Sequence, residues 1–194
     1  MPRQPDPLLE DRILNAAQTL WKRGGDSALT MRAVARAART NTPAVYRRFK
    51  NRRDLVRGVL LRTVVRFAKL FEAGRTVEEM TDVYIQKALE DPHEYRLFYT
   101  YSKELTRGKG SAESKPLRES RPNFALLEQR LSSQLGGSPE EYTQLALALW
   151  SMAHGTTMML LDNTIAGHEQ ELRNAFRAAV KSLIENAAQK PPAV

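Results

Sequence analysis

The sequence predicts an all-α protein of about nine helices. No run of residues alternates between apolar and polar in the way that a strand requires, and turn residues do not bound such runs. Ala, Leu, Arg and Glu dominate the segments in which apolar residues recur every three or four positions. We expect a three-helix domain at the N-terminus, followed by a larger helical domain.

The first predicted helix runs from about residue 8 to residue 23. Its apolar residues lie on one face, and Gly24 and Gly25 end it. Thr30 is a suitable N-cap for a short second helix, because its hydroxyl can accept a bond from a free backbone N–H group.

A turn near Arg39 separates this helix from a third. Asn41 or Thr42 is the expected N-cap, and Pro43 falls in the first turn, where its missing N–H is least harmful. Asn51 is then expected to cap a longer helix that reaches about residue 74.

The rest of the chain carries clearer helix starts. Residues 76–79 have the spacing of a capping box, and residues 138–141 combine an N-cap, a Pro and a Glu in the same way. Residues 91–94 open another helix, and residues 172–187 form the last one. Residues 107–122 are polar and rich in Gly and Ser, so we expect a loop there, followed by a helix that starts at residues 120–122 and ends at Gly136 and Gly137.

The net charge of +8 is confined to the N-terminal part. Residues 1–57 hold 13 Lys or Arg and 5 Asp or Glu, whereas the remainder has equal numbers of both signs. Within residues 30–53, eight side chains are basic. Such asymmetry indicates a nucleic-acid or membrane-surface partner for the basic part.

Several classes of protein are excluded or disfavoured. The chain has no Cys and only 3 scattered His, and it lacks a nucleophile elbow, a phosphate loop and a dinucleotide fingerprint. We therefore expect no catalytic residues, no metal and no cofactor. Polar side chains interrupt the uncharged segment 142–161, so we expect a buried helix rather than a membrane span. Residues 1–11 lack the apolar core of an export signal, which predicts a cytoplasmic protein.

Residues 30–53 have the features of a helix-turn-helix that reads DNA. Small residues in the first helix would let it cross closely over the second, and Val34, Val45 and Phe49 would supply a small core. Short side chains then start the second helix, where it would enter a groove about 12 Å wide. Basic side chains follow where phosphates would lie.

This segment resembles the N-terminal domain of the TetR family of bacterial transcriptional regulators. The resemblance covers about the first 60 residues, and the spacing of Tyr46-x-x-Phe49 from the first helix is its most specific part. Val34-Ala35 occupies the position of the family's Ile-Ala pair. Arg39 replaces the usual turn Gly, which requires the backbone to avoid positive φ or to bear some strain. Arg52 replaces the usual Lys.

The resemblance implies a set of DNA contacts. Thr30 would bond a phosphate, Thr42, Pro43 and Ala44 would face the bases, and Tyr46 and Arg52 would clamp the backbone. We interpret Arg47 and Arg48 as hydrogen-bonding base readers, and Arg39 as either a DNA contact or a solvated turn residue. The full candidate DNA-binding set is Thr30, Arg39, Thr40, Asn41, Thr42, Pro43, Ala44, Tyr46, Arg47, Arg48, Lys50 and Arg52.

One such motif contacts few phosphates, so we expect a homodimer that reads a palindromic site on double-stranded DNA. A helix over 139–163 that is apolar on two sides would pack against its own domain and against a partner, together with the last helix. The candidate interface residues are Leu145, Leu149, Met152, Thr156, Met159, Leu172, Phe176, Val180 and Leu183.

Members of the family usually bind a small molecule in the C-terminal domain, so the resemblance implies an effector of unknown identity. The candidate lining residues are Phe67, Phe71, Tyr84, Phe98, Tyr101, Phe124, Trp150 and His154. The pair Trp150 and His154 also resembles a Trp…His-Gly signature of some TetR-type regulators. Each of these residues has an alternative role as plain core, and Trp150 and His154 are either a cavity wall or a packed pair.

The sequence therefore predicts a DNA-binding transcriptional regulator, interpreted as a homodimeric repressor that a small hydrophobic effector releases. The expected domains are 8–66 for DNA binding, with the motif at about 30–49, and 67–194 for effector binding and dimerisation. The alternative is a TetR-like DNA-bound factor that uses no small molecule and works through a protein partner.

Overall fold

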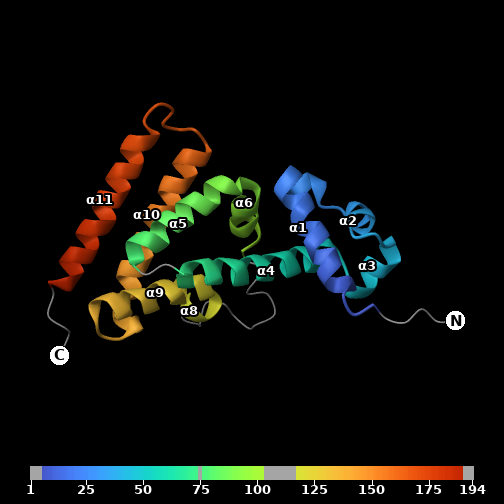
Figure 1. Cartoon of the computed structure of the whole chain (residues 1–194), viewed down its shortest axis with the longest axis horizontal. Coiled ribbons are helices and arrows are strands. Elements are labelled where there is room, and N and C mark those ends of the chain that lie inside the picture. Colours follow the sequence, from blue (N-terminus) through green and yellow to red (C-terminus); the bar gives the residue numbers. More distant parts are fainter. Residues whose placement is uncertain (1–5, 74–75, 103–116, 190–194) are drawn as a thin grey trace. The chain divides into compact units, whose positions relative to one another are not determined.

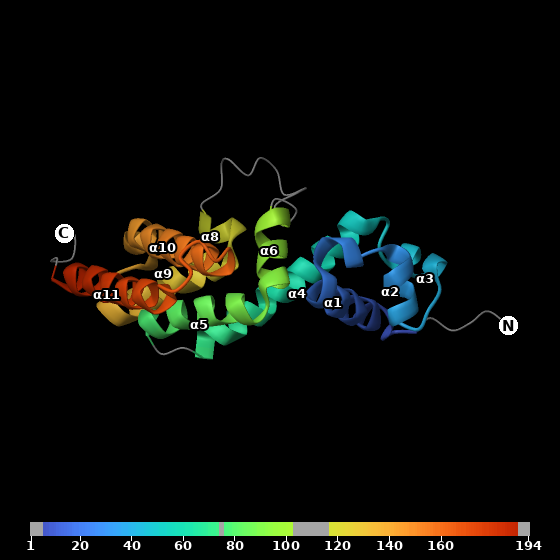
Figure 2. The same ribbon diagram turned by 90° about the horizontal axis from the view of Figure 1, so that it is seen from above.

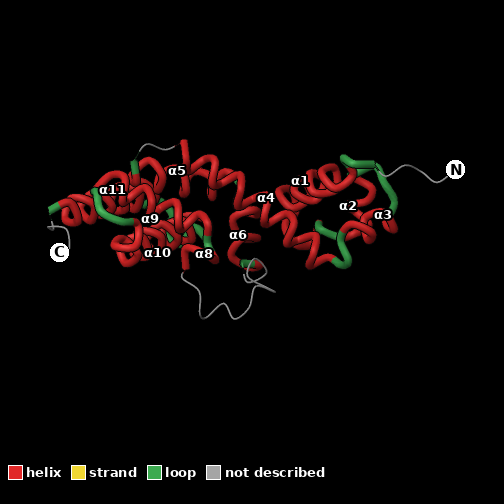
Figure 3. The backbone as a smooth tube through the Cα atoms, turned by 90° about the horizontal axis from the view of Figure 1, so that it is seen from below, coloured by secondary structure: helices red, strands yellow, loops and turns green. Residues whose placement is uncertain are grey.

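The computed structural model describes residues 6–73, 76–102 and 117–189. Within these residues the chain forms ten α-helices and one 3₁₀ helix and contains no strand (Figure 3). The all-α prediction is confirmed. The chain divides into two compact units, of which unit 1 comprises Met1–Thr63 and Asp91–Gly110, and unit 2 comprises Val64–Glu90 and Ser111–Val194.

Unit 1 contains the predicted helix-turn-helix. Helix α1 (Leu9–Ala28) packs against α2 (Met31–Ala37), which packs against α3 (Thr42–Arg48), and α4 (Arg52–Ala73) begins in the same unit (Figure 1). Helix α6 (Pro92–Tyr101) also belongs to unit 1, because it packs along α1. The expected boundary at residues 66 and 67 did not anticipate this later helix. The core of the unit includes Ile13, Ala17, Trp21, Leu29, Val34, Ala35, Ala38, Val45, Leu55, Leu60 and Leu97.

The predicted N-caps of unit 1 are present. Thr30 Oγ1 accepts a hydrogen bond from the backbone N–H of Ala33 at 3.1 Å. Asn41 Oδ1 accepts from the backbone N–H of Ala44 at 2.9 Å, which settles the choice between Asn41 and Thr42. Asn51 Oδ1 accepts in the same way from Asp54 at 3.0 Å. Each bond satisfies an N–H that would otherwise lack a partner at the helix start.

Among the described residues of unit 1, Gly25 and Arg39 have positive φ. Gly25 has φ 61° and ψ −146°, which breaks the helical path of α1 near the predicted stop, although α1 resumes as far as Ala28. Arg39, at the turn between α2 and α3, has φ 53°. The turn therefore keeps the conformation that suits Gly, and Arg39 bears the steric cost of its Cβ.

Unit 2 is built around one uncharged helix. Helix α10 (Thr143–Leu161) packs against α5 (Val77–Glu90), α9 (Pro122–Leu135) and α11 (Glu169–Ala188) (Figure 2). A 3₁₀ helix, η2 (Pro139–Tyr142), leads into α10. The core of the unit comprises Phe71, Val77, Met80, Ile85, Phe124, Leu127, Leu131, Ala146, Leu149, Ala153, Phe176, Val180 and Ile184.

Both predicted capping boxes are formed in unit 2. Thr76 Oγ1 accepts from Glu79 N at 3.1 Å, and Glu79 Oε2 accepts from Thr76 N at 3.4 Å. Glu141 Oε1 accepts from the backbone N–H and the hydroxyl of Ser138, both at 2.9 Å, and these bonds lower the pKa of Glu141.

The expected loop over 107–122 is wrong at its end. Leu117–Ser120 forms a short helix, α8, and α9 begins two residues later. Residues 107–116 lie outside the described part of the chain. Arg118 explains why α8 is held, because its guanidinium lies 3.2 Å from Oε2 of the buried Glu128 and also pairs with Glu140. Thr143 donates to Glu128 Oε1 at 2.6 Å, so α8, α9 and α10 meet at one carboxylate.

Among the described helices, none is both long enough and apolar enough to cross a bilayer. The inner face of α10 is buried in unit 2, where Ala146, Leu149, Ala153 and Thr157 are at most 3% exposed. The expectation of a buried helix over this segment is met on that face, whereas Leu147 and Met159 on the outer face are 38% and 36% exposed.

The strain at Arg39 yields a prediction. We expect Arg39→Gly to raise the free energy of unfolding by about 0.5–1 kcal/mol, because Gly adopts positive φ without a Cβ clash but loses more backbone entropy on folding. Arg36→Gly, within helix α2, is the matched control and should lower it by about 1 kcal/mol. Urea unfolding measures both. Equal destabilisation by the two substitutions would contradict the strain at Arg39.

Candidate nucleic-acid interface

Helix α3 presents one face to solvent and one to the core of unit 1. Val45 is fully buried and Phe49 is 7% exposed, whereas Pro43, Tyr46, Arg47 and Lys50 are exposed. These exposed positions follow the spacing i, i+3, i+4 and i+7, so they form a single stripe along α3 and its C-terminal end. Tyr46 is 49% exposed, so its ring and its hydroxyl are open to a partner.

The structure separates the predicted DNA contacts into available and unavailable groups. Ala44 is only 3% exposed and packs in the core of unit 1, so its side chain is not open to the bases that the resemblance implies it would face. Thr30 uses its hydroxyl oxygen as an N-cap acceptor, and its O–H remains a donor that suits a phosphate. Arg39, Asn41, Pro43, Tyr46, Arg47, Arg48 and Lys50 are exposed, and Thr40 and Thr42 are half-buried.

Five basic side chains around the motif have no acidic partner. Across residues 6–73, 76–102 and 117–189, none of them has an ion pair or a side-chain hydrogen bond, and all are exposed. These are Arg32, Arg36, Arg39, Arg47 and Lys50. Cations that are not neutralised inside the protein attract a polyanion most strongly, since phosphate binding releases counterions without breaking an internal bond.

Sequence reasoning missed two of these cations. Arg32 and Arg36 lie one turn apart on α2 and are exposed on the same side of that helix. The signal was present in the sequence, because basic residues at i and i+4 flank the buried Val34 and Ala35. Their position on the first helix of the motif suits contact with the DNA backbone, which that helix crosses in proteins of this kind.

Arg48 is partly occupied by the N-terminal segment. Its Nη2 lies 3.4 Å from the backbone oxygen of Asp6, and its Nη1 lies 4.0 Å from a carboxylate oxygen of Glu10. Both contacts are long and exposed, so they constrain Arg48 weakly. Arg47 has no such contact within the described residues and is the better placed of the two predicted base readers.

Arg52 differs from the expectation more strongly. Its Nε donates to Leu29 O at 2.9 Å, its Nη2 donates to Asp26 Oδ1 at 2.6 Å, and its Nη1 donates to the Tyr101 hydroxyl at 3.3 Å. The side chain is 35% exposed. Its guanidinium is therefore bonded within unit 1, and the phosphate clamp that the resemblance implies for Arg52 stays a prediction.

The titration of this cluster reflects the same contacts. The Tyr101 hydroxyl and the Arg52 guanidinium lower the pKa of Asp26, although burial acts in the opposite direction. Burial disfavours the charged form of Arg52, but its bonds to Tyr101 and Asp26 outweigh this effect, so its pKa is raised. Arg52 and Asp26 therefore stay charged together.

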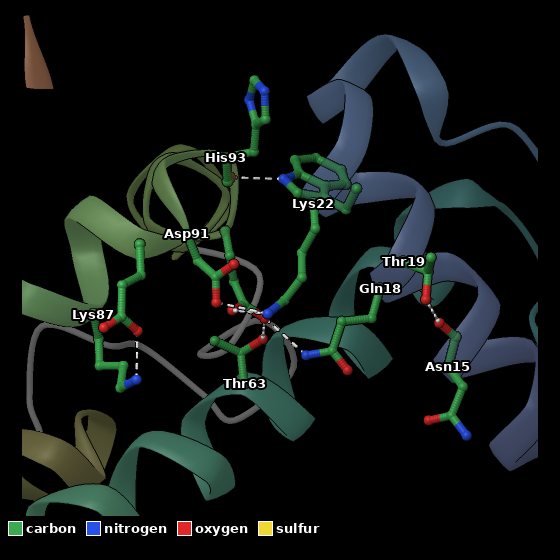
Figure 4. Close-up of polar contacts among 11 residues, drawn as sticks. Asn15, Gln18, Thr19, Lys22, Thr63, Lys87, Asp91 and His93 are labelled. Atoms are coloured by element: carbon green, nitrogen blue, oxygen red, sulfur yellow. Dashed lines mark hydrogen bonds and ion pairs between the residues drawn. The ribbon is translucent and has the colours of Figure 1, made fainter.

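A buried carboxylate fixes α6 within unit 1. Glu94 is 1% exposed, and its Oε1 accepts from Gln18 Nε2 at 2.7 Å and from Thr63 Oγ1 at 3.0 Å. Lys22 Nζ lies 3.7 Å from Glu94 Oε2 and 2.6 Å from Asp91 Oδ2. Figure 4 shows the labelled side chains of Gln18, Lys22 and Thr63 converging from α1 and α4 on this part of α6.

The predicted effector-lining residues fall into different places. Phe98 and Tyr101 lie on α6 in unit 1, and Tyr101 packs edge-on against Trp21 with ring centroids 5.8 Å apart. The others belong to unit 2 and form two groups there. Phe71 lies 5.9 Å from Phe67 and 6.4 Å from Tyr84, measured between ring centroids, and Phe124 lies 6.0 Å from Trp150.

His154 lies one turn beyond Trp150 on α10 and is half-buried. Burial lowers the pKa of His154, because the apolar surroundings disfavour the imidazolium. The neutral side chain suits either a packed pair or an apolar cavity wall. The role of the pair stays a prediction.

The candidate dimer residues divide between the two faces of their helices. Leu149, Thr156, Phe176 and Val180 are at most 7% exposed and pack within unit 2, so they are not available to a partner chain. Leu145, Met152, Leu172 and Leu183 are half-buried, whereas Met159 is 36% exposed. Leu147, from the second apolar stripe of α10, is 38% exposed.

No group of three or more His, Cys, Asp or Glu side chains suited to a metal ion occurs in the described part of the chain. Unit 1 presents hydrogen-bond donors and cations on two short helices, α2 and α3. This arrangement is that of a helix-turn-helix DNA-binding protein.

Comparison with known families identifies the chain more closely. Residues 13–59 match the family model for bacterial regulatory proteins of the tetR family, and residues 77–183 match that for the tetracyclin repressor-like C-terminal domain. The chain therefore belongs to the tetR family of DNA-binding transcriptional regulators, and the predicted resemblance is confirmed. No curated protein matches the chain.

Solved structures with the same fold extend over nearly the whole chain. The regulatory protein SCO4313 is 20% identical with a TM-score of 0.67, and the match covers 91% of this chain and 95% of that one. The multidrug binding protein EbrR, solved with imidazole, is 20% identical with a TM-score of 0.61, covering 100% and 96%. A TetR variant from Acinetobacter baumannii AYE in complex with minocycline is 16% identical with a TM-score of 0.59, covering 94% and 96%.

The lowered pKa of His154 gives a pH prediction. In the unfolded chain His154 binds a proton near pH 6.5, whereas in the folded chain burial lowers its pKa. The contribution of the neutral His154 to the free energy of unfolding is therefore fully present above pH 6.5 and is lost as the pH falls below it. We expect the free energy of unfolding of the wild type to fall between pH 7 and pH 5.5, and to fall less in His154→Gln. Thermal unfolding across this range measures the difference.

The comparison of the two proteins isolates the imidazole of His154, because the Gln side chain that replaces it does not titrate in this pH range. If His154→Gln retained the full wild-type pH dependence, burial of His154 would not be the cause.

Proposed function

We propose that this chain is a homodimeric transcriptional repressor that binds a palindromic operator and is released by a small hydrophobic molecule. The observation that carries the proposal is the exposed stripe on α3, in which Tyr46, Arg47 and Lys50 lie beside the turn residues of the motif. Their donors are directed outward rather than consumed by the fold. The proposal goes beyond membership of the family, which establishes a DNA-binding regulator.

The stripe suits the major groove in size and chemistry. Helix α3 has seven residues and is therefore about 10 Å long, or two turns. One side of these two turns fits in a groove about 12 Å wide. Arg47 offers a forked donor that pairs with guanine O6 and N7. Pro43 offers only apolar contact, for which a thymine methyl is the fitting partner. Tyr46 and Lys50 have donors suited to phosphate.

The remaining face of α10 supports the dimer. Its outward residues carry no formal charge, and they recur at helical spacing over more than three turns. They comprise Gln144, Leu147, Ala148, Ser151, Gly155 and Met159. A Cβ at Gly155 would meet nothing within 4 Å, so the backbone there is open to a closely packed helix. A two-fold axis at this face would give each dimer two helix-turn-helix motifs, one from each protomer.

The aromatic content of unit 2 supports an apolar effector. Phe71 and Phe124 are each 5% exposed and have aromatic neighbours, so a ligand that enters there would meet ring faces. Proteins with the same fold bind imidazole and minocycline. In our proposal the effector binds more tightly to a conformation of the dimer in which the distance between the two α3 helices no longer fits the operator. This difference in affinity shifts the population of dimers toward that conformation.

The role of Arg47 is tested by substitution. We expect Arg47→Ala to weaken operator binding by about 1–3 kcal/mol per half-site and to leave binding to random DNA nearly unchanged, because base contacts carry sequence information. Fluorescence anisotropy with operator and scrambled duplexes at one salt concentration measures both affinities. An equal loss on the two duplexes would show that Arg47 contacts phosphate rather than bases.

The dimer is tested on the exposed apolar face of α10. We expect Leu147→Glu to convert the dimer into a monomer at micromolar concentration, because two carboxylates would be buried near a two-fold axis without partners. Val65→Glu is the matched control, since Val65 is 57% exposed and lies on α4. Multi-angle light scattering measures the mass of each. A monomeric wild type, or a dimeric Leu147→Glu, would contradict this interface.

A further inference from the structure

We propose that Arg52 is a positioning residue for DNA recognition, and that it fixes the helix-turn-helix by binding α6 rather than by contacting phosphate. The proposal rests on the proposed DNA-binding function and identifies how unit 1 holds its reading helices. It reverses the role that the position of Arg52 in the motif suggests.

Arg52 first holds the connection between α1 and α2. Its Nε donates to Leu29 O at 2.9 Å, and its Nη2 donates both to Asp26 O at 3.1 Å and to Asp26 Oδ1 at 2.6 Å. Leu29 immediately precedes Thr30, the N-cap of α2. The first residue of α4 therefore fixes the point at which the first helix of the motif begins.

Arg52 also holds the last residue of α6. Its Nη1 donates to the Tyr101 hydroxyl at 3.3 Å, and its Cζ lies 5.9 Å from the centroid of the Tyr101 ring. The Tyr101 hydroxyl in turn donates to Asp26 Oδ1. Arg52, Asp26 and Tyr101 thus form a closed triangle in which each side chain bonds the other two. We call these three residues the Arg52 triangle.

The α6 side of the triangle is itself immobilised. Glu94, two turns before Tyr101, is 1% exposed and accepts from Gln18 of α1 and Thr63 of α4. Trp21 Nε1 donates to His93 O at 2.8 Å, and the Trp21 ring meets the Tyr101 ring edge-on. A buried carboxylate with such bonds cannot shift without losing them, so Tyr101 is a fixed anchor for Arg52.

Donor availability decides between positioning and phosphate binding. A guanidinium has five N–H donors. Four of those of Arg52 donate to Leu29 O, the Tyr101 hydroxyl, the backbone oxygen of Asp26 and Asp26 Oδ1. A bidentate phosphate contact would break at least one of these bonds. Lys50, by contrast, is exposed and unpaired within the described residues, so it reaches a phosphate without any such loss.

Salt dependence separates the two roles. Loss of one phosphate contact reduces the slope of log K against log salt concentration by about 0.9. We expect Arg52→Gln in the full chain to leave this slope unchanged, to lower operator affinity about tenfold at every salt concentration, and to lower Tm by several degrees. Lys50→Gln is the control for simple removal of a surface charge and should leave Tm unchanged.

A second variant keeps the charge of Arg52. Tyr101→Phe removes only the hydroxyl of the triangle, and we expect it to lower Tm and operator affinity without changing the salt slope. In thermal unfolding, Arg52→Gln combined with Tyr101→Phe should cost less stability than the sum of the single substitutions, because both break the same bond.

Two results would overturn the proposal. One is a salt slope reduced by about 0.9 in Arg52→Gln with an unchanged Tm, which would identify a phosphate contact. The other is strict additivity of Arg52→Gln and Tyr101→Phe in stability. The comparison of the two single variants with the double variant measures stability and needs no DNA. It therefore tests the Arg52 triangle even if the wild type binds no operator, a result that would refute the proposed function alone.

Discussion

Unit 1, the DNA-reading unit that carries the helix-turn-helix, depends on one buried carboxylate, that of Glu94. Burial of a carboxyl group that is only 1% exposed is unfavourable unless hydrogen-bond donors surround it, and here Gln18 of α1 and Thr63 of α4 donate to it. Satisfying Glu94 therefore sets the relative positions of three helices. The Trp21 bond to His93 O and the Lys22 pair with Asp91 follow from the same arrangement, because they lie along the same contact of α1 with α6.

Polar groups in unit 1 serve two separate purposes. Glu94, Thr63, Gln18 and Arg52 are bonded inside the protein and give it shape, whereas Arg47 and its exposed basic neighbours are left for a ligand. The division is physical, since a cation with internal partners has less free energy to gain from phosphate than an exposed one. This division explains how the eight basic residues within 24 positions of the motif can have different roles.

Local signals made much of this structure predictable. The N-caps at Thr30, Asn41 and Asn51 and the two capping boxes all depend on residues within four positions of one another. What the sequence did not reveal depends on distant contacts. Ala44 is buried in the core of unit 1, where α2 packs against α3, and Arg52 bonds Tyr101, 49 positions away. The turn at Arg39 kept positive φ because the surrounding packing outweighs the preference of one residue.

The DNA-reading unit is discontinuous in the chain, and this affects its synthesis. Helices α1 to α3 leave the ribosome well before α6, since the second half of α4 and all of α5 lie between them. At 5–20 residues per second, about 2–8 s separate the emergence of Thr63 from that of Tyr101. During that interval Gln18, Lys22 and Arg52 have no partners from α6. The nascent chain therefore carries an incomplete, strongly basic segment until α6 has been synthesised.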